Sequence, residues 1–128
     1  MPTPFSRAFL QCVNEHSITS LRAGANRTKF TGIWMVVVNG RIFGRPYYLA
    51  QRSWYNAFLK ERIGEIKCDK AIIRVKGIAP EDLDGIAPAI NEAYARKYNA
   101  KPHNRKWVDG LCDPERVKHT MEFLRPEN

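Results

Sequence analysis

Two arginines lie among aromatic residues in the stretch GRPYYLAQRSWYNAF, residues 44–58, and together they could hold an anion beside a planar ring. Arg45 brings a permanent positive charge, and its planar guanidinium suits carboxylate or phosphate. Arg52 directly precedes Ser53, a typical N-cap for a short helix over WYNAFLKER. Helix N-termini expose unpaired N–H groups that favour anions. The stretch therefore indicates an anion site, unless Ser53 only caps the helix and Arg52 is solvated.

A β-hairpin must position Arg45. The segments TGIWMVVV and RIFGRPYY flank Asn39-Gly40, and Asn-Gly tolerates the positive φ angles of a type I′ turn. A two-residue turn at this point determines the register of the two strands. The expected cross-strand pairs are Val38 with Arg41, Val36 with Phe43, and Trp34 with Arg45.

The two faces of this hairpin differ in character, because side chains alternate between faces along a strand. The uncharged face is the natural interior of a barrel, and it carries Ile33, Met35, Val37, Ile42, Gly44 and Pro46. The opposite face joins large apolar groups to arginines, which need partners when they are buried; it carries Trp34, Phe43, Tyr47, Arg41 and Arg45. Three interpretations of the second face remain open: a helix cover with acidic partners, a subunit interface, or a groove for a planar anionic ligand.

Other patterns predict the surrounding elements. Apolar residues at helical spacing predict a helix within residues 4–15, and residues 16–32 read as a polar loop. The segments GEIKC and AIIRVKGI predict a second hairpin that turns at Asp69-Lys70. Residues 80–99 predict a helix, and Pro88 favours a late start for it.

A last strand is expected over VKHTMEFLR, residues 117–125. The order of elements predicts an α+β protein, an antiparallel split β-barrel of about six strands with inserted helices. The length favours a single domain over residues 1–128, with the N-terminal helix packed on the barrel.

Composition bears on the partners and the compartment of the protein. The net charge of +8 and pI of about 9.7 suggest anionic partners without choosing among them. The three cysteines are far apart and form no C-x-x-C pair, which argues against a disulfide and favours a reducing cytoplasm. The longest apolar run, IWMVVV, is too short to span a membrane.

No metal site or catalytic residue is predicted. The histidines His16, His103 and His119 lack metal-ligand spacing. Cys112 is expected to be an ordinary thiol, because activation needs an adjacent base and an orienting group.

The segment ARKYNAKPHNRKW, residues 95–107, interleaves five basic residues with Tyr98 and Trp107. Such a pattern can bind single-stranded nucleic acid. No RNA-recognition or helix-turn-helix signature accompanies it, so a solvated connector is the preferred interpretation.

The segments TGIWMVVVNGRIFGR, SWY, GEIKC, AYARKY and HTMEFLRP resemble a small uncharacterised bacterial family, a domain of unknown function related to the flavin-reductase-like split barrels. These barrels include the pyridoxamine-phosphate-oxidase-like proteins and the deazaflavin-dependent nitroreductases. The resemblance covers residues 28–126. It implies a six-stranded, partly open barrel, commonly dimeric, with flavin mononucleotide (FMN) or deazaflavin bound near the dimer interface.

The resemblance also implies roles for particular residues. Arg45, Arg52 and Ser53 correspond by position to phosphate-binding residues. Trp34, Met35 and Val36 would lie beside the cofactor ring, and Trp54 with Tyr55 would shape the wall.

Two functional hypotheses follow. The first is a homodimeric split-barrel protein that binds FMN, deazaflavin or a related phosphorylated ligand, with oxidoreductase activity if it is an enzyme. The alternative is a non-catalytic basic module that binds nucleic acid or an acidic protein. Whether the protein holds any cofactor stays open.

Overall fold

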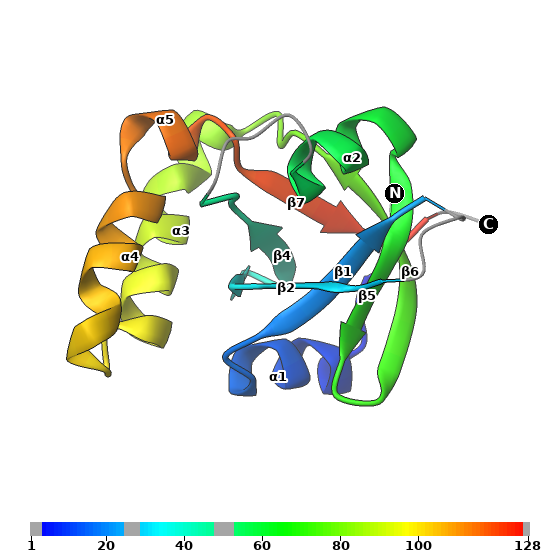
Figure 1. The fold of residues 1–128 in the computed structure, drawn as a ribbon, viewed down its shortest axis with the longest axis horizontal. Helices are drawn as coiled ribbons and strands as arrows, with labels where there is room; N and C mark the ends of the chain where they lie inside the picture. The colour runs from blue at the N-terminus through cyan, green and yellow to red at the C-terminus, as the bar shows by residue number, and fades with distance from the viewer. Residues whose placement is uncertain (1–3, 25–28, 48–52, 127–128) are drawn as a thin grey trace.

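The computed structural model describes residues 4–24, 29–47 and 53–126. Within these ranges, seven antiparallel strands form one sheet in the order β2-β1-β5-β6-β7-β4-β3, curled into a nearly closed barrel with helices around it (Figure 1). The α+β split-barrel prediction is therefore confirmed, with seven strands in place of about six. The elements are α1 (Arg7–Glu15), β1 (Thr19–Ala23), β2 (Thr31–Ile33), β3 (Met35–Val38), β4 (Arg41–Gly44), α2 (Trp54–Glu61), β5 (Ile63–Cys68), β6 (Ala71–Ile78), α3 (Leu83–Tyr98), η1 (Pro102–Asn104), α4 (Arg105–Leu111), α5 (Pro114–Val117) and β7 (Met121–Leu124).

The seam of the barrel lies at Trp34. Strands β2 and β3 are the two outer strands of the sheet order, yet Trp34 alone separates them in the sequence. One residue can join the two outer strands only if the sheet curls until its edges approach each other. TGIWMVVV is therefore two strands, and the indole stands where they meet.

The first hairpin forms as predicted. Asn39 and Gly40 have φ angles of 53° and 77°, which are the left-handed values of a type I′ turn. Val36 pairs with Phe43 and Val38 with Arg41, as expected. The ladder ends at Met35 and Gly44, so the expected Trp34–Arg45 pair is not part of it.

The two faces of this hairpin enter different cores. Met35 and Ile42 are fully buried in the barrel interior, together with residues of α1 and α2. Val36 and Phe43 pack on the outside against Ile90 and other residues of α3 and α4. The arginine-bearing face is therefore covered by helices (Figure 1).

Arg41, on the face that the helices cover, has two acidic partners. Its Nη1 and Nη2 donate to both carboxylate oxygens of Asp82, next to α3, at 2.9 Å each. Its Nε and Nη2 also reach both oxygens of Glu122 on β7, at 3.0 and 2.9 Å. These bonds and charges raise the pKa of Arg41 above its usual value. The first of the three open interpretations therefore describes Arg41.

The segment 16–32 is not a loop throughout. Thr19, Leu21 and Ala23 alternate inward along β1, with Ser20 and Arg22 less buried. The strand pairs with both β2 and β5. The sequence signal for this strand is an alternation of inward and outward residues, which is hard to recognise because Thr and Ser are polar.

The C-terminal third also differs from expectation. Helix α3 begins at Leu83, so Pro88 lies inside it and the prediction of a late start is wrong. Pro88 deprives the Asp84 carbonyl of its helical donor, and both residues are exposed to water, which can bond that carbonyl instead. The last strand begins at Met121, because Pro114–Val117 form α5.

Two cysteines meet across the fold. Cys12 on α1 and Cys68 at the end of β5 form a disulfide, with their Cα atoms 6.3 Å apart. The prediction that no disulfide forms is therefore wrong. A sequence separation of 56 residues gives no hint that α1 packs against β5.

Among the described residues, no helix is long and apolar enough to cross a membrane.

Candidate functional site

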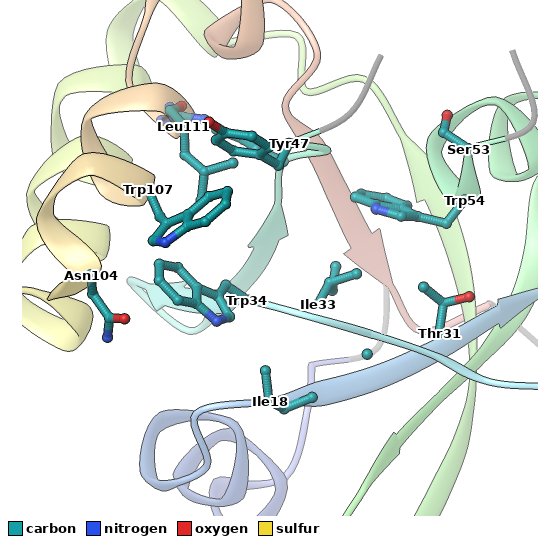
Figure 2. Close-up of a pocket in the computed structure, with 12 residues that line it drawn as sticks. Ile18, Thr31, Ile33, Trp34, Tyr47, Ser53, Trp54, Asn104, Trp107 and Leu111 are labelled. Atoms are coloured by element: carbon teal, nitrogen blue, oxygen red, sulfur yellow. Dashed lines mark hydrogen bonds between the residues drawn. The ribbon is translucent and has the colours of Figure 1, made fainter. Parts of the chain in front are cut away.

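A cavity of about 660 Å³ opens beside the barrel seam. Its residues come from β2, the seam, α2 and α4, which are distant in the sequence (Figure 2). The lining residues are Ile18, Thr31, Gly32, Ile33, Trp34, Arg45, Tyr47, Ser53, Trp54, Asn104, Trp107 and Leu111.

Aromatic rings form much of the wall. Figure 2 shows Trp34 and Trp107 on one side of the cavity and Trp54 on the other. Trp34 stacks on Tyr98 with ring centroids 3.9 Å apart and planes 4° from parallel. Tyr47 packs edge-on against Trp107 at 4.8 Å. Stacking holds these rings in place, so the cavity presents flat apolar surfaces before any ligand enters.

Arg45 contributes to this wall but is only 2% exposed. Its Nε donates to Thr120 Oγ1 at 2.9 Å, and its Nη1 donates to Asn91 Oδ1 at 2.5 Å and to the Leu111 carbonyl at 3.1 Å. Its Nη2 is buried without a hydrogen-bond partner among the described residues. Burial lowers the pKa of Arg45 from its usual value.

The acceptors that hold Arg45 are neutral groups, unlike those that hold Arg41. The charge of Arg45 is therefore buried without a carboxylate in the part of the chain described here, which is an energetically costly arrangement. Because this buried charge lies beside a cavity, Arg45 is a candidate for interaction with an anion bound there.

Tyr94 connects Arg45 to the seam. Its hydroxyl accepts a hydrogen bond from the Arg45 backbone N–H at 3.1 Å and donates one to the Trp34 carbonyl at 2.9 Å. The ring is fully buried, and burial raises the pKa of the hydroxyl well above its usual value. Trp34 and Arg45 are thus joined through a side chain of α3 rather than through the sheet ladder.

We expect Tyr94→Phe to lower the free energy of unfolding by about 1–3 kcal/mol, because it leaves a buried N–H and a half-buried carbonyl without their partner. Urea denaturation would measure the loss. Tyr98→Phe is the comparison, since it keeps the ring and removes the hydrogen bond to the Ser17 carbonyl at 2.7 Å. No loss of stability in Tyr94→Phe would contradict the bridging role of Tyr94.

The eight residues predicted for cofactor binding separate into three groups. Trp34, Arg45, Ser53 and Trp54 all line the cavity. Met35, Val36 and Tyr55 do not line it and are buried in the two cores. Arg52 lies outside the described residues.

Ser53 performs the capping role that was its alternative interpretation. Its Oγ accepts a hydrogen bond from the Asn56 N–H at 3.3 Å and so caps α2. The N-terminal end of α2 therefore lies at the cavity, where the helix dipole favours negative charge.

Sequence reasoning missed the contribution of α4. Trp107 and Leu111 line the cavity four residues apart, so they share one face of the helix. Trp107, Val108 and Leu111 have the spacing of an amphipathic helix, and that signal was available. It was overlooked because the basic residues around it suggested a connector.

The segment 95–107 is not a connector, because it consists of the end of α3, η1 and the start of α4. Lys97 is half-buried and donates to the carbonyls of Val13 and Met35, at 2.6 Å each. Burial lowers its pKa to about 8. Arg96 pairs with Glu92. Lys97 and Arg96 therefore make contacts within the protein and are not simply solvated charges.

Cys112 has the environment of an ordinary thiol. It is half-buried, and burial raises its pKa above the usual value. The neighbouring Asp113 pairs with Arg116 and caps α5. His119 Nδ1 lies 2.8 Å from the Glu115 carbonyl, and its ring packs on Tyr55.

Comparisons with known proteins add the following. Residues 9–123 match the family described as uncharacterized protein conserved in bacteria (DUF2255). The fold is similar to that of the conserved hypothetical protein Rv2991 from Mycobacterium tuberculosis, with a TM-score of 0.56 and 12% sequence identity, over 97% of this chain and 81% of that one. At this identity the likeness concerns the fold alone. None of the curated proteins matches the sequence.

Proposed function

The chain belongs to the bacterial family DUF2255, and from its cavity we propose that it binds a planar aromatic cofactor of the flavin or deazaflavin class. The observation that carries the proposal is the set of aromatic rings around one cavity. The volume of about 660 Å³ is in the range of small-molecule sites. Flat apolar walls suit a fused-ring ligand better than a flexible polar one.

The residues present fit the two parts of such a ligand. Trp34, Trp107 and Trp54 would enclose the ring system from opposite sides. A phosphate would be attracted to the N-terminal end of α2 at Ser53. The charge of Arg45 would act on it through space, because its Nε and Nη1 already donate within the protein and its Nη2 is buried.

A flavin bound in this cavity would supply hydride or electron transfer. The protein residues would hold the ring and exclude water from it. The resemblance to flavin-reductase-like split barrels supports the same assignment, and it also supports a homodimer with the site near the dimer interface. Light scattering of the purified protein would measure the mass against 14.8 kDa for one chain.

Binding can be tested with FMN and with deazaflavin on freshly purified protein. We expect either ligand to raise the melting temperature and FMN fluorescence to be quenched by the tryptophans, with a stabilisation of about 2.7 kcal/mol at 100 times the dissociation constant. Riboflavin, which lacks the phosphate, should bind more weakly than FMN and with less dependence on salt.

Trp107→Ala is expected to remove the melting-temperature shift, since it deletes one wall of the cavity. Leu59→Ala is the control, because Leu59 is 46% exposed and does not line the cavity. The proposal fails if neither ligand shifts the melting temperature at concentrations well above micromolar, or if Trp107→Ala and Leu59→Ala behave alike.

A further inference from the structure

Three side chains that can ligate metal meet at the opposite end of α1 from its N-cap. Cys12 and His16 are four residues apart, which places them on one face at the end of the helix. Cys68 is the last residue of β5, against which α1 packs. His16 Nδ1 lies 3.6 Å from Cys12 Sγ and 3.9 Å from Cys68 Sγ.

The separations suit one bound ion. The candidate ligand atoms of the three residues all lie within 4.8 Å of one another. In a tetrahedral zinc site the Zn–S bonds are about 2.3 Å and the Zn–N bonds about 2.0–2.1 Å, so neighbouring ligand atoms are about 3.5–3.8 Å apart. The two sulfur–nitrogen distances are close to that value. The two sulfur atoms are bonded to each other in the disulfide and must move apart to reach it.

The ligand types select the kind of metal. Two thiolates and one imidazole are a donor set for zinc and other thiophilic ions, whereas calcium and magnesium prefer oxygen ligands. Exposure also favours entry of an ion, since His16 is exposed and Cys12 is half-buried, while Cys68 is 1% exposed.

We propose that Cys12, His16 and Cys68 form a binding site for one thiophilic metal ion such as Zn²⁺ when the Cys12–Cys68 disulfide is open. A water molecule occupies the fourth position on the solvent side. Coordination through Nδ1 replaces the contact of that atom with the Cys12 carbonyl, at 2.8 Å.

The disulfide and the metal exclude each other, because a disulfide sulfur is not a thiolate. A dithiol reductant breaks the S–S bond by supplying two electrons and two protons, and is itself oxidised to a disulfide. The product is two thiols, and Zn²⁺ then displaces both thiol protons into solvent. A reducing compartment therefore favours the metal-bound form and an oxidising one the disulfide.

Cobalt is a direct probe, because Co²⁺–thiolate coordination gives a charge-transfer absorption band. Untagged protein is reduced with dithiothreitol, freed of it by anaerobic gel filtration, and titrated with Co²⁺. We expect the band to saturate at one equivalent and to disappear on addition of excess Zn²⁺. Untreated disulfide-bonded protein should show no band.

Variants identify the ligands. His16→Ala should weaken Co²⁺ binding by about tenfold or more, and it should fold normally because His16 is exposed. Cys12→Ser should weaken both the thiolate band and the affinity for Co²⁺, because only one of the two thiolates remains. Cys112→Ser removes the remaining cysteine, which lies elsewhere on the fold, and should bind like the wild type.

The proposal is overturned if the reduced protein shows no band, if His16→Ala leaves the affinity unchanged, or if Cys112→Ser loses the band. Circular dichroism on each variant confirms that a lost band reflects a lost ligand. This outcome is independent of flavin binding, which uses a different set of residues.

Discussion

Gly64→Ala is expected to destabilise the protein by about 2–4 kcal/mol or to prevent folding. Gly64 lies in β5, opposite Ala23 of β1 and Val75 of β6. A Cβ at this position would lie 2.2 Å from the Arg22 carbonyl oxygen and 2.6 Å from Phe58 Cζ. Phe58 is fully buried in the barrel core and the carbonyl belongs to a neighbouring strand, so neither atom can move freely.

Gly85→Ala is the matched control. Gly85 lies in the first turn of α3, and a Cβ there meets nothing within 4 Å. Alanine should stabilise the helix by about 0.5–1 kcal/mol, because it restricts the unfolded chain. Thermal and urea unfolding of both variants measure the contrast. Comparable stabilities for the two variants would contradict this prediction, because they would show that the Arg22 carbonyl and Phe58 can shift to make room for a Cβ at position 64.

Arg41→Met is expected to cost about 2–4 kcal/mol, because it leaves the carboxylate of Glu122 buried without its counter-charge. Glu122 is 5% exposed, and both of its oxygens accept hydrogen bonds from Arg41. The side chain of Arg41 is 30% exposed, so solvent reduces the loss below that of a fully buried pair. Methionine retains most of the apolar stem.

A double variant separates charge from packing. Arg41→Met combined with Glu122→Gln should recover part of the loss seen in Arg41→Met, because no uncompensated charge remains. Asp82→Asn should have a small effect, since Asp82 is exposed. If the double variant were no more stable than Arg41→Met in urea unfolding, the loss would come from packing instead.

Local patterns predicted the elements whose causes lie within a few residues. The Asn39-Gly40 turn needs two positive φ angles, and the sequence supplies the residues that adopt them. The turn between β5 and β6 forms at Asp69-Lys70 as expected, with Asp69 at a φ of 54°. Ser53 caps α2 for the same kind of local reason.

The candidate site was predictable in part. Trp34, Arg45, Ser53 and Trp54 all line the cavity. The hairpin that ends beside Trp34 and Arg45 and the cap at Ser53 were visible in the sequence, whereas the barrel seam at Trp34 was not. Trp107 was missed because its helix was read as a connector. Whether Arg45 would meet a carboxylate depended on which residues of α3 and of the segment just before β7 lie beside it, and these are Asn91 and Thr120.

By itself, the sequence determined the two hairpin turns, the Ser53 cap, the uncharged inward face of the first hairpin and the α+β class, because these depend on backbone preferences and side-chain periodicity. Only the tertiary structure decided that α3 and α4 cover the arginine-bearing face, that Arg41 pairs with Glu122, and that Cys12 meets Cys68. Each of these contacts joins residues that are far apart in the sequence. Their proximity follows from the closure of the barrel at Trp34 and the packing of helices around it, which no local pattern encodes.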